Sequence, residues 1–200
     1  GKTTLLNIIA GLVKEDEGKL VVNKERLAYV FQEPRLLPWK TVAENIKFAQ
    51  DNFMSPGEGE QIRERLLKRI ELLPFKDSYP VSLSGGMKQR VEFARALAVE
   101  PDVLLMDEPF KSLDVALKYQ MEELLLDEHK RRGFTVLFAT HDPAEAVALA
   151  DRVIVLTAKP THVLKEICVD IPRDKRSLGM PQLYEKYEEV LGFVRQNIAG

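Results

Sequence analysis

Three apolar runs in the second half of the chain predict its central sheet. They cover Val103–Met106, Val136–Ala139 and Val153–Leu156, and none contains a polar residue. A strand that is apolar on both faces is typical of a parallel sheet covered by helices on either side. Apolar residues at helical spacing over roughly 115–132 and 143–150 supply such helices between the runs. The pattern therefore predicts an α/β fold around a parallel sheet.

The two ends of the chain predict helices and strands of their own. Apolar residues recur at helical spacing from Leu5, and this pattern ends near Gly18. Two short runs rich in apolar and β-branched residues, 20–22 and 27–31, flank a polar tetrapeptide and predict a hairpin or strand pair. The tail predicts a further strand over 162–171 and a terminal helix over 183–198.

The region between residues 33 and 98 has a different character. Prolines and charged residues surround helical stretches at about 42–50 and 60–73, which indicates a helical subdomain inserted in the α/β core. After Gly86, apolar residues recur at i, i+4, i+7 and i+11, so the helix that begins there buries one face. The polar positions expected away from that face are Lys88, Gln89 and Glu92.

Composition narrows the classes of protein. The chain has 200 residues, 45% of them hydrophobic, and a formal net charge of −2, so no general attraction to nucleic acid or anionic lipid is expected. No apolar run approaches the roughly 20 residues that span a bilayer. We expect no signal peptide before the domain, and we expect any membrane role to be by docking. The single cysteine, Cys168, is expected to be a buried strand residue in a reducing cytosol.

The first four residues resemble the end of a phosphate-binding loop. Gly1-Lys2-Thr3-Thr4 matches the last part of the pattern G-x-x-x-x-G-K-[ST], in which the lysine reaches the phosphates and the hydroxyl binds Mg²⁺. The sequence thus begins inside a motif, and we expect the fold to lack its N-terminal strands. Without the earlier turns of the loop, we expect this 200-residue polypeptide to hydrolyse ATP poorly or not at all.

Two further motifs point to a nucleoside triphosphate. Residues 83–90 read Leu-Ser-Gly-Gly-Met-Lys-Gln-Arg, and a serine and two glycines that open a helix offer N–H groups and a hydroxyl to an anion. The run at 103–106 ends in Asp107-Glu108-Pro109. Two carboxylates at the exit of a buried strand can hold a metal ion and polarise an attacking water.

With these motifs on one chain, the sequence resembles the nucleotide-binding subunit of an ABC transporter. Leu83–Gln89 matches the family signature and Val103–Glu108 its Walker B strand. The resemblance implies a P-loop NTPase fold with a RecA-like parallel-sheet core. It implies a single ATPase domain over 1–200, in which 1–32 and 99–200 form the α/β core and 33–98 form the helical subdomain with the signature motif.

The resemblance also implies roles for single residues. Glu108 would act as general base, His141 in Thr140-His141-Asp142 would contact the γ-phosphate, and Gln32 would sense metal and attacking water. Asp107, Thr3 and Gln32 would bind Mg²⁺. The residues expected at ATP are Gly1, Lys2, Thr3, Thr4, Ser84, Gly85, Gly86, Gln89 and Asp114. His129 and His162 match no motif and are expected to be ordinary surface or strand residues.

The signature implies a dimer, because Ser84–Gly86 cannot easily reach a γ-phosphate held by Lys2 of the same chain. The family arrangement is a head-to-tail homodimer with two ATP molecules between the subunits, and Asp114 matches the D-loop along that interface. Lys111-Ser112 replaces the smaller pair usual before Leu113-Asp114. Expected partners are integral membrane permease subunits and, indirectly, an extracytoplasmic solute-binding protein, with no nucleic acid. The expected location is cytoplasmic and peripheral, on the inner face of the cell membrane.

The loop after Gln32 narrows the resemblance and leaves one question open. Gln32 to Trp39, with Asp107 to Phe110, is most like the nitrate, sulfonate and taurine importer branch. Three large apolar residues in this proline-bounded loop, Leu36, Leu37 and Trp39, fit core packing or a groove for a permease helix about equally well. The alternatives to an importer are a soluble ABC-type ATPase acting on ribosomes or DNA and a catalytically impaired, truncated homologue.

Overall fold

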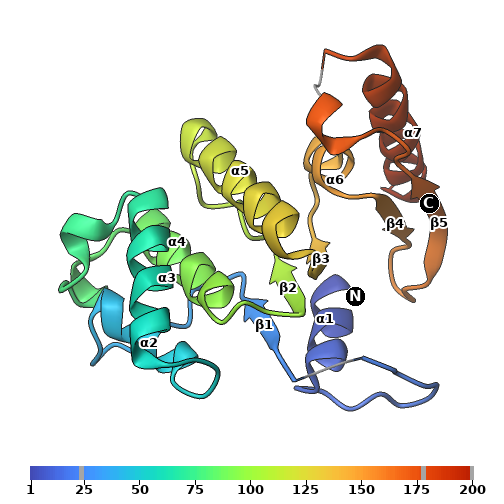
Figure 1. The fold of residues 1–200 in the computed structure, drawn as a ribbon. Coiled ribbons are helices and arrows are strands. Elements are labelled where there is room, and N and C mark those ends of the chain that lie inside the picture. Colours follow the sequence, from blue (N-terminus) through green and yellow to red (C-terminus); the bar gives the residue numbers. More distant parts are fainter. Residues whose placement is uncertain (23–24, 177–178, 199–200) are drawn as a thin grey trace. The chain divides into compact units, whose positions relative to one another are not determined.

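The computed structural model describes residues 1–22, 25–176 and 179–198 (Figure 1). Contacts divide the chain into two compact units, a larger one over Leu6–Ala139 and a smaller one that joins Gly1–Leu5 to Thr140–Gly200. Each unit is described by itself. The subdomain boundaries expected at 32/33 and 98/99 fall inside the larger unit and stay a prediction.

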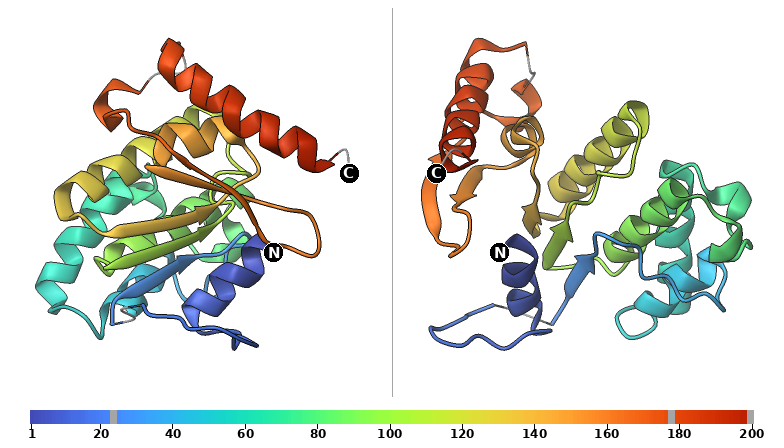
Figure 2. Two further views of the ribbon diagram at one scale, coloured as in Figure 1. Left: turned by 90° about the vertical axis from the view of Figure 1, so that its right-hand side faces the viewer. Right: turned by 180° about the vertical axis from the view of Figure 1, so that it is seen from behind.

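A three-stranded parallel sheet forms the centre of the larger unit, as predicted. Its strands are β1 (Leu27–Val30), β2 (Val103–Asp107) and β3 (Thr135–Ala139), in the order β1-β2-β3 (Figure 2). Leu104, Leu105 and Met106 of β2 are fully buried, which explains the unbroken apolar run. Val30 pairs with Met106 and Asp107 with Ala139, so all three strands end at one edge of the sheet.

The segment before β1 differs from the prediction. Helix α1 (Lys2–Ala10) ends well before Gly18, because Gly11 adopts a left-handed φ of 77°. The predicted strand at 20–22 is wrong, since these residues are not in a strand. Instead they line an open hollow with Ile9 and Leu137, in which Leu20 and Val22 are partly buried and Val21 is 80% exposed.

The predicted helical region is present in the larger unit, and its helices have clear start signals. It consists of α2 (Val42–Gln50), α3 (Pro56–Arg69) and α4 (Gly85–Ala98), with short 3₁₀ turns at Leu73–Phe75 and Pro80–Ser82. Thr41 and Glu44 form a capping box at α2, and Ser55 caps α3. Helix α4 packs against α2, α3 and β1, which puts it between the other helices and the sheet.

Two polar residues of α4 lie where the sequence did not place them. Gln89 is 2% exposed and Glu92 is 0% exposed, so both face the interior. The expectation that they lie away from the buried face is wrong, because α4 is covered on more than one side.

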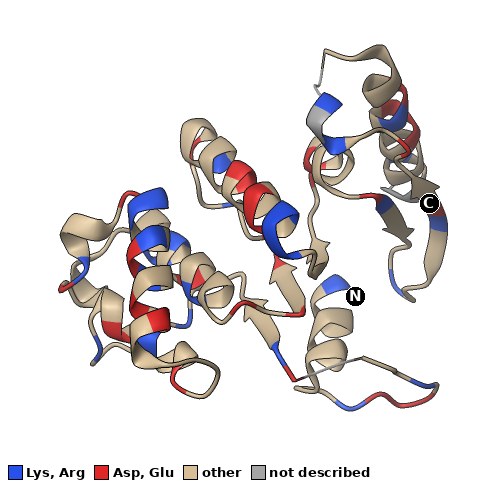
Figure 3. Cartoon of the chain, viewed as in Figure 1, with Lys and Arg blue, Asp and Glu red and all other residues tan. Residues whose placement is uncertain are grey.

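Helix α5 (Val115–Arg132) connects β2 to β3 and begins at the N-cap Asp114. It ends at Gly133, whose φ of 71° closes the helix in the left-handed conformation. Figure 3 shows acidic residues in the middle of α5 and basic residues at its C-terminal end, the arrangement that the helix dipole favours at that end.

The smaller unit has a hairpin where the sequence predicted a further parallel strand. Strand β4 (Arg152–Leu156) pairs antiparallel with β5 (Val163–Cys168). Helices α6 (Pro143–Leu149) and α7 (Pro181–Ile198) and a 3₁₀ turn at Arg173–Lys175 complete it. Val153 and Val155 are buried while Ile154 is 47% exposed, so β4 is covered on one face only.

Cys168 is exposed at the end of β5, which corrects the expectation of a buried residue. Its neighbour Ile167 takes the inward position, and side chains alternate along a strand. Across the described parts of the chain, no helix combines the length and apolar character needed to cross a membrane.

Candidate functional site

The site in the larger unit is built at the carboxyl edge of the parallel sheet. Asp107 is the last residue of β2 and is 3% exposed, and Glu108 follows it directly. Because Val30 pairs with Met106, the segment that carries Gln32 leaves β1 at the same edge. The structure therefore brings Gln32, Asp107 and Glu108 to one edge, where ligands bind in open α/β sheets.

Glu108 lies in an unusual backbone conformation. Its φ is 49°, in the left-handed region that non-glycine residues rarely adopt. Its N–H donates to the carbonyl of Ala139 at 2.9 Å, which ties the turn to the end of β3. The Nζ of Lys111 lies 3.6 Å from its carboxylate Oε2. A strained conformation held by its surroundings is common at functional sites.

Tyr29 on β1 adds a neutral donor near Asp107. Burial, and then the negative charge of Asp107, raise the pKa of Tyr29 to about 12. Its hydroxyl donates to Oδ1 of Asn7 on α1 at 3.1 Å. Tyr29 therefore stays protonated at physiological pH and joins the sheet to the helix.

The signature residues begin α4. Ser84 is the N-cap, and its hydroxyl accepts the N–H of Met87 at 3.2 Å. A Cβ atom added at Gly85 would meet no described atom within 4 Å, and one added at Gly86 would be 3.7 Å from Leu113. The folded chain by itself gives no steric reason for glycine at either position, although glycine is unfavourable in a helix.

Asp114 also has a structural role. Its carboxylate accepts the N–H of Leu117 at 3.0 Å and so caps α5. In Asp114 as in Ser84, the side-chain oxygen of a residue expected to contact nucleotide already accepts a backbone N–H at the start of a helix. Both residues are exposed, so the cap does not remove them from the surface.

Gln89 is not at the surface with the other signature residues. Its side-chain amide donates to the carbonyls of Pro109 at 3.2 Å and Phe31 at 3.5 Å. It therefore connects the segments before Gln32 and after Glu108, and we assign it to positioning in place of ATP contact. Sequence reasoning missed this role, and it also missed Glu92 and Arg95 on the same stripe of α4, spaced three residues apart.

The remaining predicted site residues belong to the smaller unit. Gly1–Thr4 are exposed at the start of α1, where the N–H of Leu5 donates to the carbonyl of Gly1 at 2.9 Å. His141 is exposed two residues after the end of β3. Its neighbour Asp142 donates its N–H to Thr140 Oγ1 at 3.0 Å and caps α6. His141 is thus part of a defined turn at the helix start.

Comparisons with known proteins identify the family of this chain. Residues 1–111 match the model of the family described as ABC transporter. The chain is 42% identical to the protein named aliphatic sulfonates import ATP-binding protein SsuB 2 of Pseudomonas syringae pv. tomato, over 88% of this chain and 75% of that one. It is 38% identical to nitrate import ATP-binding protein NrtC of Synechococcus elongatus, over 98% of this chain and 32% of that one.

A solved structure gives the same result for the fold. It is the dimeric post-hydrolysis state of an ATP-binding cassette bound to ADP and inorganic phosphate. The TM-score is 0.73 at 32% sequence identity, and the match covers 84% of this chain and 81% of that one. The predicted P-loop NTPase fold is confirmed. The chain belongs to the ABC transporter family, as an ATPase domain of that family.

Proposed function

We propose that the protein is the ATP-hydrolysing subunit of an importer for small oxyanions of the nitrate, sulfonate or taurine type. Two similar proteins are named as import ATP-binding proteins for aliphatic sulfonates and for nitrate. The subunit works on the cytoplasmic face of the membrane with permease subunits, and a solute-binding protein outside the membrane selects the solute. The observation that carries the proposal is the pair Asp107-Glu108 at the sheet edge beside the segment of Gln32.

The carboxylates have different tasks in this proposal. Asp107 is almost fully buried and offers hard oxygen ligands suited to Mg²⁺, together with the amide of Gln32 and the hydroxyl of Thr3. Among the described residues, no group of three or more His, Cys, Asp or Glu side chains is arranged to hold a metal ion. Phosphate oxygens and water would complete the Mg²⁺ shell, and the bound ion would neutralise charge on the phosphates.

Glu108 orients the water that attacks the γ-phosphate and accepts its proton. Its side chain is 13% exposed, so it remains accessible to water at the edge of the sheet. His141 contacts the γ-phosphate, and Lys2 with the N–H groups at the start of α1 holds the phosphates. ATP supplies the energy, and the two phosphate-binding halves come from different subunits.

The open surface at Gly85 supports a dimer. A glycine that the fold does not need is explained when another molecule approaches its backbone closely. In a head-to-tail dimer that molecule is the ATP held by the partner subunit. The N–H groups at the start of α4 and the positive end of its dipole then face a triphosphate.

The permease is proposed to dock near the loop after Gln32. Trp39 is 70% exposed, so the alternative of core packing is wrong for this residue. Phe48 on α2 is 55% exposed, and the Nζ of Lys40 lies 5.6 Å from the centre of its ring. Exposed aromatic side chains beside a basic group fit an amphipathic cytoplasmic helix of a membrane subunit.

The experiment that tests the function uses Glu108→Gln in the natural gene product. This variant is expected to bind Mg·ATP, to lose turnover and to form a dimer, because removing the base stops hydrolysis but leaves both half-sites. Light scattering after size exclusion, with and without Mg·ATP, measures the mass. A variant that stays monomeric at saturating Mg·ATP, even with its permease, or that hydrolyses ATP like the parent, contradicts the proposal.

A further inference from the structure

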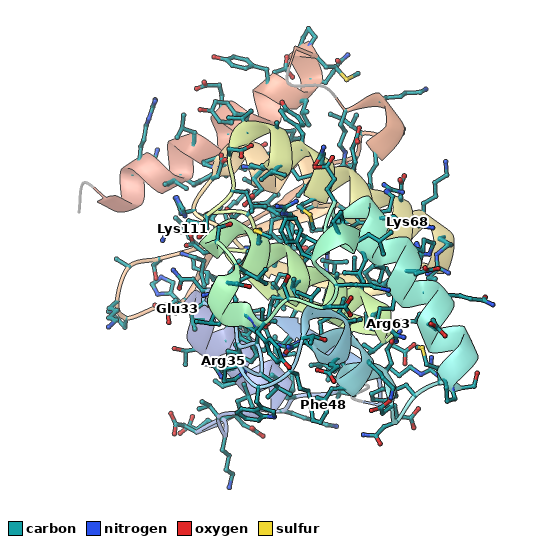
Figure 4. The ribbon with its side chains drawn as sticks, turned by 90° about the vertical axis from the view of Figure 1, so that its left-hand side faces the viewer. Glu33, Arg35, Phe48, Arg63, Lys68 and Lys111 are labelled. Carbon is teal, nitrogen blue, oxygen red and sulfur yellow. The ribbon has the colours of Figure 1, made fainter. Side chains whose placement is uncertain are left out.

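A buried ion pair on α4 holds the segment that carries Gln32. The carboxylate of Glu92 is fully buried, and Arg95 donates to its Oε2 at 2.6 Å. The same Oε2 accepts the N–H of Arg35 at 3.2 Å, and Arg95 donates to the carbonyl of Arg35 at 2.9 Å. Glu92 and Arg95 together therefore bind both backbone polar groups of Arg35, the loop residue that Figure 4 labels.

The other end of the loop is held by the same helix. Gln89, one turn before Glu92, donates to the carbonyl of Phe31 and to that of Pro109. The guanidinium of Arg35 lies 3.9 Å from the centre of the Phe31 ring, so the two ends of the loop also contact each other. Gln32 therefore lies between Phe31 and Arg35, whose backbones are both hydrogen-bonded to α4. The same helix is hydrogen-bonded to Pro109, in the turn after Glu108.

Stability alone does not account for this arrangement. A buried carboxylate loses its hydration, and an apolar residue of similar volume is often as stable or more stable in its place. Burial raises the pKa of Glu92 above its usual range, and the charge of Arg95 offsets part of that effect. One oxygen, Oε1, has no hydrogen-bond partner among the described residues. The burial of this ion pair therefore costs free energy of folding that an apolar side chain in the same place would not cost.

We propose that Glu92, with Arg95, is a positioning residue for hydrolysis: it sets the place of Gln32 relative to Glu108 and makes that place depend on the orientation of α4. The inference rests on the proposed function. Helix α4 carries Ser84–Gly86 in its first turn. When these residues engage a triphosphate, any shift of the helix moves the peptide groups of Phe31 and Arg35 with it.

The test compares Glu92→Ala and Glu92→Gln with a matched control. Glu128 on α5 is also buried, at 4% exposed, and is paired with Arg65 and Arg131, but it does not contact the loop. We expect Glu92→Ala to lower kcat by about 10- to 100-fold, as a misplacement of about 1 Å does. KM for ATP is expected to stay within about twofold. Glu92→Gln keeps the acceptor oxygen and is expected to recover part of kcat.

Glu128→Ala is expected to lose stability while kcat per folded molecule is unchanged. If Glu92→Ala lowers kcat no more than Glu128→Ala does, or raises KM in the same proportion, the inference is wrong. Should Glu92→Ala not fold, Glu92→Gln carries the same comparison, and an unchanged kcat in that variant overturns the inference.

Hydrogen exchange gives a readout that does not depend on ATP turnover. The amide of Arg35 is expected to be protected in the parent and in Glu128→Ala, and to exchange faster in Glu92→Ala. Equal protection in all three overturns the positioning role. A parent protein that binds no nucleotide but shows the expected exchange pattern contradicts the proposed function and leaves the contact of Glu92 with the loop in place.

Discussion

The ammonium group of Lys111 lies 3.6 Å from the carboxylate of Glu108, in the turn directly after β2. The ion pair spans three positions of the chain, and the N–H of Lys111 also donates to the carbonyl of Glu108 at 3.3 Å. The sequence shows that Lys111 departs from the small residue usual at this position of the family, but it does not show which residue forms an ion pair with it. In the structure the residue that replaces a small one lies beside the proposed general base, and Figure 4 shows it at the surface.

Lys111→Met is expected to raise kcat for ATP hydrolysis by up to about fivefold. Two unit charges about 4 Å apart in water attract each other by roughly 1 kcal/mol, and removing that attraction is expected to leave more of the negative charge of the carboxylate for the attacking water. The Lys111 side chain is 51% exposed, so stability should change by less than about 1 kcal/mol. Steady-state ATPase assays measure kcat.

Two control variants separate this effect from a general change of charge. Lys111→Arg keeps the positive charge and should keep the parental kcat. Lys118→Met removes a similar pair with Glu122, 3.8 Å apart on α5 and away from the turn, and should have no effect. An unchanged or lower kcat in Lys111→Met contradicts the proposed competition.

Gly85→Ala is expected to separate function from folding. Because a Cβ atom there meets no described neighbour, the variant should fold with the same or a slightly higher melting temperature, since alanine favours helix by up to about 1 kcal/mol. The methyl group would occupy the space that a triphosphate needs, so Mg·ATP-dependent dimerisation and turnover should be lost.

The matched control for Gly85→Ala is Gly57→Ala, in the first turn of α3 and equally free of described neighbours. It should keep its dimer and its turnover. If Gly85→Ala remains fully active, the idea that another molecule closely approaches this backbone is wrong.

Local patterns predicted the larger unit better than the smaller one. The bounds of α2 and the unbroken apolar run of β2 follow from short-range spacing and burial on both faces. Strand β4 pairs with residues seven to sixteen positions later in the chain, and that choice of partner does not appear in the apolar content of either segment.

Within the candidate site, the motif residues could be identified because their chemistry is local. Local spacing does not indicate that Glu92 is buried, because its partner Arg35 lies 57 positions away in the chain. Gln89 was misplaced for the same reason. A polar stripe on a helix indicates solvent unless another segment covers it, and only tertiary contacts decide that.

Glu128 predicts how stability depends on pH. Burial raises the pKa of Glu128, but the hydrogen bonds and charges of Arg65 and Arg131 lower it by more. The pKa of Glu128 therefore lies below the ordinary value of 4.5. A folded-state pKa below the unfolded one adds stability that is present above about pH 4.5 and is lost as the pH falls through the folded-state pKa.

Glu128→Gln should therefore lower the free energy of unfolding at pH 7 by about 2 kcal/mol, the order expected when one partner of a buried pair loses its charge. The difference from the parent should be smaller at pH 3 than at pH 7, because the stability that the charged carboxylate adds is lost as the pH falls through its lowered pKa. Urea titrations at the two pH values measure it. Glu166 forms an exposed pair with Arg152, so the free energy of unfolding of Glu166→Gln should differ little from that of the parent at either pH. If Glu128→Gln differs from the parent by the same amount at both pH values, the lowered pKa of Glu128 is contradicted.

Trp39→Ala is expected to prevent assembly with the permease while the subunit stays folded. At 70% exposed, the indole contributes little to the core, so the melting temperature should stay within a few degrees of the parent. Buried in an interface, a tryptophan commonly accounts for 2 kcal/mol or more, which corresponds to a loss of affinity of roughly 30-fold. Copurification of the permease in detergent measures assembly. Tyr119→Ala removes another exposed aromatic side chain, on α5, and should leave assembly intact. If Trp39→Ala assembles with the permease as well as Tyr119→Ala does, the permease docks elsewhere.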